Sequence, residues 1–178
     1  MEEKILKLRK DHRWKSRPGY GICVLDRGLV RFDFPEHWIL KHEREAIKIH
    51  DAEPPDDNCV LGVSHFHFPN VDFSGLPLRK LLAGSVVDQG LEMIERQEIV
   101  ETRRGDLQTA AIEIRHRESN REAVTRVLVA RCGDIHCLIT FNCWADQREQ
   151  MDPVWDEVLR SLVLGWHVAD PTVGPVAH

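Results

Sequence analysis

Two histidines, His65 and His67, stand one residue apart within the apolar stretch LGVSHFHFP. Side chains two residues apart in a β-strand point to the same face of the sheet, so these imidazoles would be placed to share a metal ion. A zinc site needs a third protein ligand, for which His116 and His136 on other predicted strands are the candidates. The pair therefore supports two hypotheses: a metal-binding protein or metal-dependent hydrolase, or a strand whose outer end carries structural histidines.

The sequence contains no further pattern that is typical of catalysis. It has no G-x-S-x-G nucleophile turn, and its glycines form no phosphate-binding loop followed by lysine. His136 directly precedes Cys137, but neighbouring side chains of a strand point to opposite faces, so this base cannot activate this thiol. We therefore expect a protein that is not an enzyme and that uses no cofactor.

Length and composition are typical of one globular domain, since the 178 residues are 42% hydrophobic and 30% charged. The formal net charge of −5 and the isoelectric point of about 6.0 provide no basic surface for nucleic acid. No window has the roughly 18–20 consecutive apolar residues of a membrane span, and the basic N-terminus lacks the apolar part of a secretion signal. These features favour a cytoplasmic protein without nucleic-acid partners and without membrane insertion.

The cysteine pattern agrees with a reducing compartment. An odd number of cysteines without C-x-x-C spacing indicates neither a disulfide framework nor a zinc knuckle. We expect reduced thiols that are mostly buried. The five cysteines are Cys23, Cys59, Cys132, Cys137 and Cys143.

The two ends differ in composition from the middle of the chain. The first seventeen residues hold seven basic and three acidic side chains, a local net charge of +4 on an otherwise acidic chain. We interpret residues 1–27 as a basic arm or short helix that either faces solvent or docks on an acidic partner. Residues 167–178 contain two prolines and one glycine and are expected to form a flexible tail. Residues 28–166 are expected to form the single domain.

Hydrophobic periodicity in this domain predicts two helices and about six to seven strands. Alternation of polar and apolar residues indicates strands, and a spacing near 3.6 indicates helices. Short loops between the last four strands predict an antiparallel meander. The expected strands are a segment ending at Pro35, 46–50, 59–68, 94–104, 107–118, 122–132 and 135–145, and the expected helices are 77–90 and one that follows Asp152.

The C-terminal helix has the clearest pattern. Asp152 before Pro153 is typical of an N-cap and a first helical turn, and the apolar stripe that follows requires the helix to lie on the sheet. The stripe comprises Met151, Val154, Trp155, Val158, Leu159, Leu162 and Val163. The element order β-β-β-α-β-β-β-β-α therefore predicts an α+β fold with helices packed on a mostly antiparallel sheet.

Several of these segments together resemble the PsbP-like superfamily. They are the first strand, with Phe32, Phe34, Pro35 and Trp38 in the pattern F-x-F-P-x-x-W, the strand CLITFNCW, and the closing helix WDEVLRSLVL. The resemblance covers about residues 28–166. It implies a sheet with helices packed on it. Most members of the superfamily, which include bacterial chaperones of secretion effectors, bind or position another protein without catalysis. The resemblance implies the same role for this chain.

Polar side chains on two strands of the meander predict where a partner would bind. On strands 107–118 and 135–145, polar residues alternate with apolar ones, so we expect one face of the sheet to be core and the other to be a mixed surface. The predicted partner-binding residues are Glu113, Arg115, Arg117, His136, Leu138, Thr140, Asn142 and Trp144. Strand 122–132 is apolar on both sides, so a helix that covers this surface is an open alternative.

We therefore expect a non-enzymatic cytoplasmic adaptor or secretion-chaperone-like protein, which presents this sheet face to a protein or peptide partner. A metal-binding protein built on His65 and His67 is the alternative. A structural homodimer, with Glu113, Arg115 and Trp144 in its interface, is a third hypothesis.

Overall fold

The computed structural model describes residues 8–43, 46–68, 73, 75–87 and 92–175. Residues 1–7 of the predicted arm and 176–178 of the predicted tail lie outside the described residues. The same holds for Gly90, the predicted end of the first helix.

The described part of the chain forms eleven strands and two α-helices. The strands are β1 (Tyr20–Leu25), β2 (Val30–Pro35), β3 (Ile39–His42), β4 (Ile47–His50), β5 (Cys59–His67), β6 (Glu92–Arg96), β7 (Val100–Arg104), β8 (Leu107–Glu118), β9 (Arg121–Cys132), β10 (Ile135–Trp144) and β11 (Val163–Leu164). The helices are α1 (Leu78–Val87) and α2 (Arg148–Ser161), and 3-10 turns lie at Asp26–Gly28 and Ala145–Gln147. Neither α-helix is long and apolar enough to cross a membrane.

Two antiparallel sheets contain these strands. The large sheet has eight strands in the order β3-β4-β5-β10-β9-β8-β6, with β7 also paired to β8, and the small sheet has the order β1-β2-β11. The predicted α+β class is confirmed, with more strands than the six or seven expected. The predicted strand 94–104 is present as β6 and β7, which pair with successive halves of β8 at one edge of the sheet.

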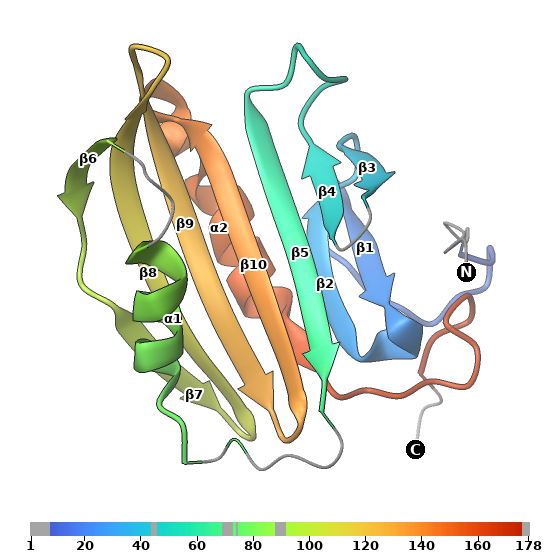
Figure 1. Ribbon diagram of the computed structural model, residues 1–178. Coiled ribbons are helices and arrows are strands. Elements are labelled where there is room, and N and C mark those ends of the chain that lie inside the picture. The colour runs from blue at the N-terminus through green and yellow to red at the C-terminus, as the bar shows by residue number, and fades with distance from the viewer. Residues whose placement is uncertain (1–7, 44–45, 69–72, 74, 88–91, 176–178) are drawn as a thin grey trace.

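The elements form three layers (Figure 1). Helix α1 lies on one face of the large sheet, over β8 and β9, whereas α2 and the small sheet lie on the other. We call these faces the α1 face and the α2 face. Strand β9 is therefore buried on both sides, with Val127 and Val129 in the α1 layer and Leu128 in the α2 layer. This arrangement explains why residues 122–132 are apolar at successive positions.

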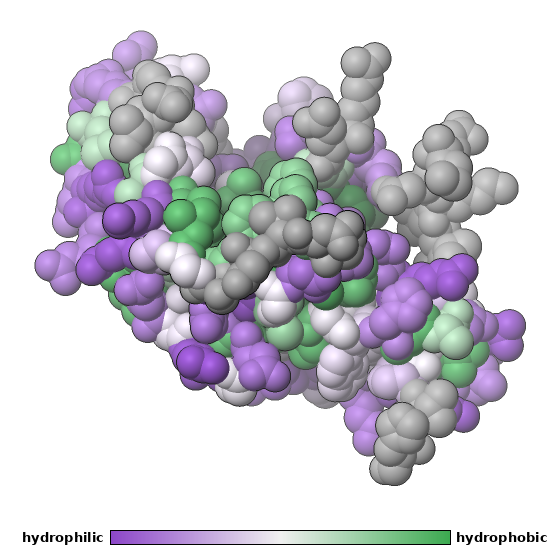
Figure 2. Space-filling view, turned by 60° about the horizontal axis from the view of Figure 1, so that its bottom comes forward, coloured by the Kyte–Doolittle hydropathy of each residue, from purple (hydrophilic) through white to green (hydrophobic). Residues whose placement is uncertain are grey.

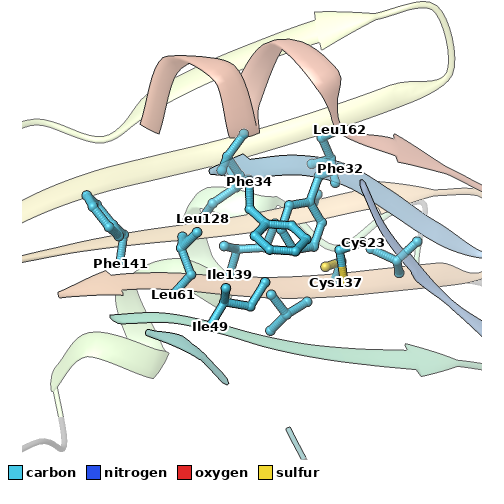
Figure 3. Packing of buried hydrophobic residues seen from close by; sticks show 14 of the residues in the cluster. Cys23, Phe32, Phe34, Ile49, Leu61, Leu128, Cys137, Ile139, Phe141 and Leu162 are labelled. Atoms are coloured by element: carbon cyan, nitrogen blue, oxygen red, sulfur yellow. The ribbon is translucent and has the colours of Figure 1, made fainter. Parts of the chain in front are cut away.

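The larger core lies between the α2 face and the layer that α2 and the small sheet form (Figure 3). Phe32 of β2 and Phe141 of β10 are fully buried there. The Phe141 ring stacks on Trp155 of α2, with ring centroids 6.0 Å apart. Burial of one such side chain contributes about 1.5–3 kcal/mol, so apolar contacts are the main attachment of this layer to the large sheet.

The C-terminal helix differs from its prediction at both ends. It begins at Arg148, so Asp152 does not cap it, and Pro153 lies inside the helix. The Asp152 carboxylate instead pairs with Arg148, at 3.6 Å. The helix ends at Ser161, and Val163 of the predicted stripe belongs to β11, which pairs with β2.

Strands β1 and β3 were not predicted. Strand β1 falls within residues 1–27, for which we expected an arm, and it pairs with β2 along its full length. Only Cys23 and Leu25 of β1 are buried, so its sequence carries a weak period-two signal. Strand β3 is four residues long and has no buried residue, so periodicity could not reveal it.

The two ends of the described chain contact each other. The backbone N–H of Arg9 donates to the carbonyl of Thr172, at 3.0 Å. The indole N–H of Trp14 donates to the carbonyl of Pro171, at 2.8 Å. These bonds join parts of the segments that the sequence analysis interpreted as arm and tail.

The cysteines lie mostly in the interior. Four are buried, and Cys132 is half-buried. Cys59 of β5 and Cys143 of β10 lie directly opposite each other in the ladder. Burial raises the pKa of Cys23 to about 12, so at neutral pH this side chain is a thiol and not a reactive thiolate.

A buried group of charged residues joins α2 to the small sheet. Asp33 of β2 and Glu157 of α2 are both 1% exposed. Arg31 Nη2 donates to Asp33 Oδ1, at 2.5 Å. Burial raises the pKa of Asp33 to about 6, although the Arg31 charge opposes this, and the neighbouring Glu157 carboxylate raises it further. A hydrogen bond from Arg160 lowers the pKa of Glu157, so Glu157 is the member of the carboxyl pair that stays ionised.

We predict that Asp33→Asn changes the pH dependence of stability. The pKa of Asp33 rises from 3.8 to about 6 on folding, so ionisation of this group opposes folding. As the pH rises from about 4 to about 6, the wild-type protein loses up to about 3 kcal/mol relative to the variant, and the difference is constant above that range. Urea unfolding of both proteins from about pH 4 to pH 7 measures this difference. A difference independent of pH would contradict the raised pKa.

Candidate functional site

The predicted partner-binding residues lie on two different faces of the large sheet. The register places Phe141 of β10 opposite Arg126 of β9, and Arg126 opposite Glu113 of β8, so odd-numbered residues of β8 and β10 share the α2 face. Glu113, Arg115 and Arg117 are therefore on the α2 face. The other predicted residues, on the α1 face, are His136, Leu138, Thr140, Asn142 and Trp144. The structure does not bring the two groups together.

On the α2 face, Glu113 is held in a network of ion pairs. Arg126 Nε donates to Glu113 Oε2 at 2.7 Å, and Arg148 Nε of α2 donates to Glu113 Oε1 at 2.8 Å. Arg126 also pairs with Asp152 of α2, and its side chain is 4% exposed. The hydrogen bond to Glu113 raises the pKa of Arg148. Both carboxylate oxygens of Glu113 are engaged, so this residue ties α2 to the sheet.

Arg115 and Arg117 lie further along β8 and are exposed. Arg115 Nη2 lies 2.7 Å from Glu122 Oε2, and Arg117 Nη1 lies 3.5 Å from Glu92 Oε1. Exposed ion pairs of this kind contribute about 0–1 kcal/mol each. These arginines therefore have partners within the chain and are separated from the α1-face residues by the thickness of the sheet.

The four histidines considered as metal ligands are also divided between the two faces of the sheet. His65 and His67 of β5 are on the α2 face, whereas His116 of β8 and His136 of β10 are on the α1 face. His67 Nε2 lies 3.0 Å from Asp134 Oδ2. Within the residues that the structure describes, no three side chains of His, Cys, Asp or Glu are arranged to hold a metal ion. The two candidate third ligands therefore lie on the wrong side of the sheet to complete the pair.

His136 packs among aromatic rings. Its ring centroid lies 5.0 Å from that of Phe73 and 5.9 Å from that of Phe68, in edge-on geometry. Burial lowers the pKa of His136, although a contact with Asp134 opposes this, and the nearby Arg131 charge lowers the pKa further, so the neutral imidazole is favoured at physiological pH. Neither of its ring nitrogens has a hydrogen-bond partner among the described residues. His136 thus acts as an aromatic packing residue.

Helix α1 covers only part of the α1 face. It packs on β8 and β9, and among the described residues no helix covers β10 and β5 on this face (Figure 1). We call this uncovered surface the open strip. It comprises Leu138, Thr140 and Asn142 of β10, Val60, Ser64 and Phe66 of β5, and Phe68 directly after β5. Half-buried apolar residues and hydrogen-bonding residues alternate on it, as they do in interfaces between proteins.

One end of the open strip is aromatic and exposed. Phe66 is 51% exposed and Phe68 is 38% exposed, and their rings stack with centroids 6.1 Å apart. Viewed from this end, the surface shows apolar patches among polar ones (Figure 2). Neither phenylalanine was predicted as a partner-binding residue, because an apolar strand residue is expected to be buried. They are in solvent because α1 lies over β8 and β9 and not over β5.

The other end of the open strip is polar. The hydroxyl of Thr125 donates to Asn142 Oδ1 at 2.7 Å, and the Thr125 Oγ1 atom lies 3.0 Å from Nε2 of the buried His116. Beside it, the Arg121 guanidinium lies over the Trp144 ring, 4.4 Å from its centroid. These contacts hold Asn142 and Trp144 in defined positions at the surface.

Comparison with known proteins identifies relatives along nearly the whole chain. The model of the family described as Alr1449 matches residues 21–168, which include both helices and most of both sheets. A protein of Nostoc sp. (strain PCC 7120), described as uncharacterized protein alr1449, is 41% identical over 175 residues, which are 97% of this chain and 91% of that protein.

Solved structures share the fold at low identity. Cyanobacterial PsbP (CyanoP) of Synechocystis sp. is 13% identical, with a TM-score of 0.59 over 83% of this chain and 93% of that one. The Ran-binding protein Mog1p of Saccharomyces cerevisiae is 10% identical, with a TM-score of 0.54 over 82% and 95%. In a structure from Bacteroides thetaiotaomicron, 11% identical, the match has a TM-score of 0.59 over 82% of this chain and 48% of that one. These likenesses confirm the predicted PsbP-like fold.

We predict that Arg126→Leu lowers the free energy of unfolding by about 3 kcal/mol, because it removes one partner from the buried pair with Glu113. Arg115→Gln is the matched control, because it removes an exposed ion pair on the neighbouring strand β8. It is expected to lower the free energy of unfolding by less than about 1 kcal/mol. Urea unfolding of the two variants compares these values. Equal losses in both would show that the Glu113 network does not attach α2 to the sheet.

Proposed function

The chain belongs to the Alr1449 family, and we propose that it is a non-enzymatic binding protein, an adaptor or chaperone, that holds a protein partner on the open strip. The observation that carries this proposal is the part of the α1 face that α1 leaves uncovered, with Phe66 and Phe68 exposed at one end. Of the predicted partner-binding residues of β10, Leu138, Thr140 and Asn142 belong to the open strip. The proposal leaves out Glu113, Arg115 and Arg117, which lie on the α2 face.

The position of the strip within the sheet defines how a partner would be held. Strands β5 and β10 each have a neighbouring strand on both sides, so their backbone groups are already paired. A partner would therefore contact side chains and would not add a strand there. Leu138 and Phe66 supply apolar area, and Thr140 and Asn142 supply hydrogen-bonding groups that set orientation.

The likeness to the Ran-binding protein Mog1p supports protein binding as the class of function. A shared fold does not transfer a particular partner. For this chain the partner is defined by the chemistry of the open strip, which favours a segment with apolar side chains flanked by hydrogen-bonding groups. We place this activity in the cytoplasm, which the acidic composition and the odd number of cysteines support.

The alternative function, a metal-dependent one at His65 and His67, has no comparable support. The two rings share a face, but His116 and His136 are on the other face of the sheet. The two functions make different use of the surface, since the histidine pair is on the α2 face and the open strip is on the α1 face. A variant of one site therefore leaves the other intact.

We predict that a photoreactive benzoylphenylalanine at Asn142 cross-links to a protein partner in cells of the source organism. Asn142 is exposed on the open strip, so irradiation is expected to give an adduct of one defined, larger mass, detected by blotting and mass spectrometry. The same group at Asp156, exposed on α2, is the matched control and is expected to give no such adduct.

A second variant tests the chemistry of the strip. Phe66→Ser removes an exposed ring without disturbing the core, and it is expected to reduce the yield of the Asn142 adduct several-fold. Circular dichroism and thermal unfolding confirm that the variant is folded. The absence of any adduct at Asn142, or an identical adduct at Asp156, would contradict a partner-binding role for this surface.

A further inference from the structure

Strand β7 forms part of one edge of the large sheet. It pairs with β8 on one side, and within the described residues no strand pairs with its other side. Half of the backbone N–H and C=O groups along such an edge point outward and are available to another strand. Val100, the first residue of β7, is 60% exposed. An exposed edge with an apolar residue is a place where another chain can add a strand.

Two of the features that usually prevent such pairing, lysine and proline, are absent from β7, although the strand is only five residues long. Edge strands of natural proteins are protected by lysine, by proline, by short length or by a covering element. Strand β3, at the opposite edge, is four residues long and contains Lys41. Strand β7, with the sequence VETRR, contains neither lysine nor proline. Strand β7 is therefore an edge strand without lysine or proline, a property that β6 at the same edge shares.

Two opposite charges on β7 determine which strand would fit. Glu101 lies opposite Ala110 of β8 and Arg103 lies opposite Gln108, so both side chains are on the α1 face. Neither forms an ion pair with another described residue. An added strand with the same two charges in reverse order would pair with both.

We propose that β7 pairs with β7 of a second copy of this chain, antiparallel and centred on Thr102, so that two large sheets join edge to edge. A two-fold axis perpendicular to the sheets makes the two edge strands antiparallel. In this register Glu101 lies opposite Arg103 of the second copy, and Arg103 lies opposite Glu101. Two ion pairs therefore form between the copies, on the same face.

The charges also exclude the neighbouring registers. Moving the centre of the pairing by one residue places either Glu101 opposite Glu101 or Arg103 opposite Arg103, and like charges directly opposite are destabilising. On the α2 face, Val100 lies opposite Arg104 of the second copy. The Arg104 guanidinium already donates to the carbonyls of Arg160 and Leu162, so its methylene chain is fixed where it can cover Val100.

Sedimentation equilibrium of the full chain tests this pairing. The wild-type protein is expected to be a dimer in equilibrium with monomer. Glu101→Arg and Arg103→Glu each replace two ion pairs by two like-charge pairs and are expected to raise the dissociation constant at least about tenfold. The double variant Glu101→Arg/Arg103→Glu restores both ion pairs with exchanged signs. Its dissociation constant is expected to return to within about threefold of the wild-type value.

A mixture of the two single variants gives a result that misfolding cannot produce. In a heterodimer of the two single variants, one copy carries arginine at positions 101 and 103 and the other carries glutamate at both. Each arginine then lies opposite a glutamate. The heterodimer is therefore expected to form more tightly than either variant alone, and native mass spectrometry resolves it from the homodimers. Glu36→Arg, a charge reversal at an exposed residue away from β7, is the matched control and should associate like the wild type.

The outcomes that would overturn the proposal are specific. They are a wild-type chain that is monomeric at every concentration, a dimer that neither reversal weakens, and single variants that do not form a heterodimer. The β7 edge lies beyond β8, whereas the open strip lies on β5 and β10. Failure here therefore leaves the proposed partner-binding function untouched, and failure of the cross-linking experiment leaves this pairing untouched.

Discussion

The burial of β9 on both faces is the constraint on which the rest of the structure depends. A strand that is apolar at successive positions is stable only when a layer covers each side of the sheet. Helix α2 and the small sheet provide one layer, and α1 provides the other. Because α1 lies over β8 and β9, no helix among the described residues covers β10 and β5 on the α1 face. The position of the open strip is thus determined by which strands the two covering layers bury.

The two faces of the sheet use their polar residues differently. On the α2 face, the carboxylate of Glu113 is neutralised by Arg126 and Arg148, and these contacts attach a helix. On the α1 face, beyond α1, Thr140 and Asn142 lie near the surface among apolar neighbours. Charge burial on one face therefore supports stability, and the uncharged polar groups of the other are suited to binding.

The sequence predicts the elements well where one periodicity dominates. The predicted strand 107–118 has the same bounds as β8, and the stripe around Trp155 correctly places α2 on the sheet. Register could not be predicted, because it depends on how neighbouring strands align, and an offset of one residue changes the face of every side chain. Glu113 and Thr140 were therefore assigned to one surface although they lie on two. The exposure of Phe66 depends on which strands α1 lies over, which no local pattern contains.

The central claim is that the open strip is occupied by another protein in the cell. Hydroxyl-radical footprinting of Phe66 and Phe68, in living cells and on the purified chain, measures this directly. The account predicts that both rings are labelled several-fold less in cells than in the purified protein, while exposed Trp166, which is outside the strip, is labelled equally in both. Equal labelling of the two phenylalanines in cells and in solution would contradict it.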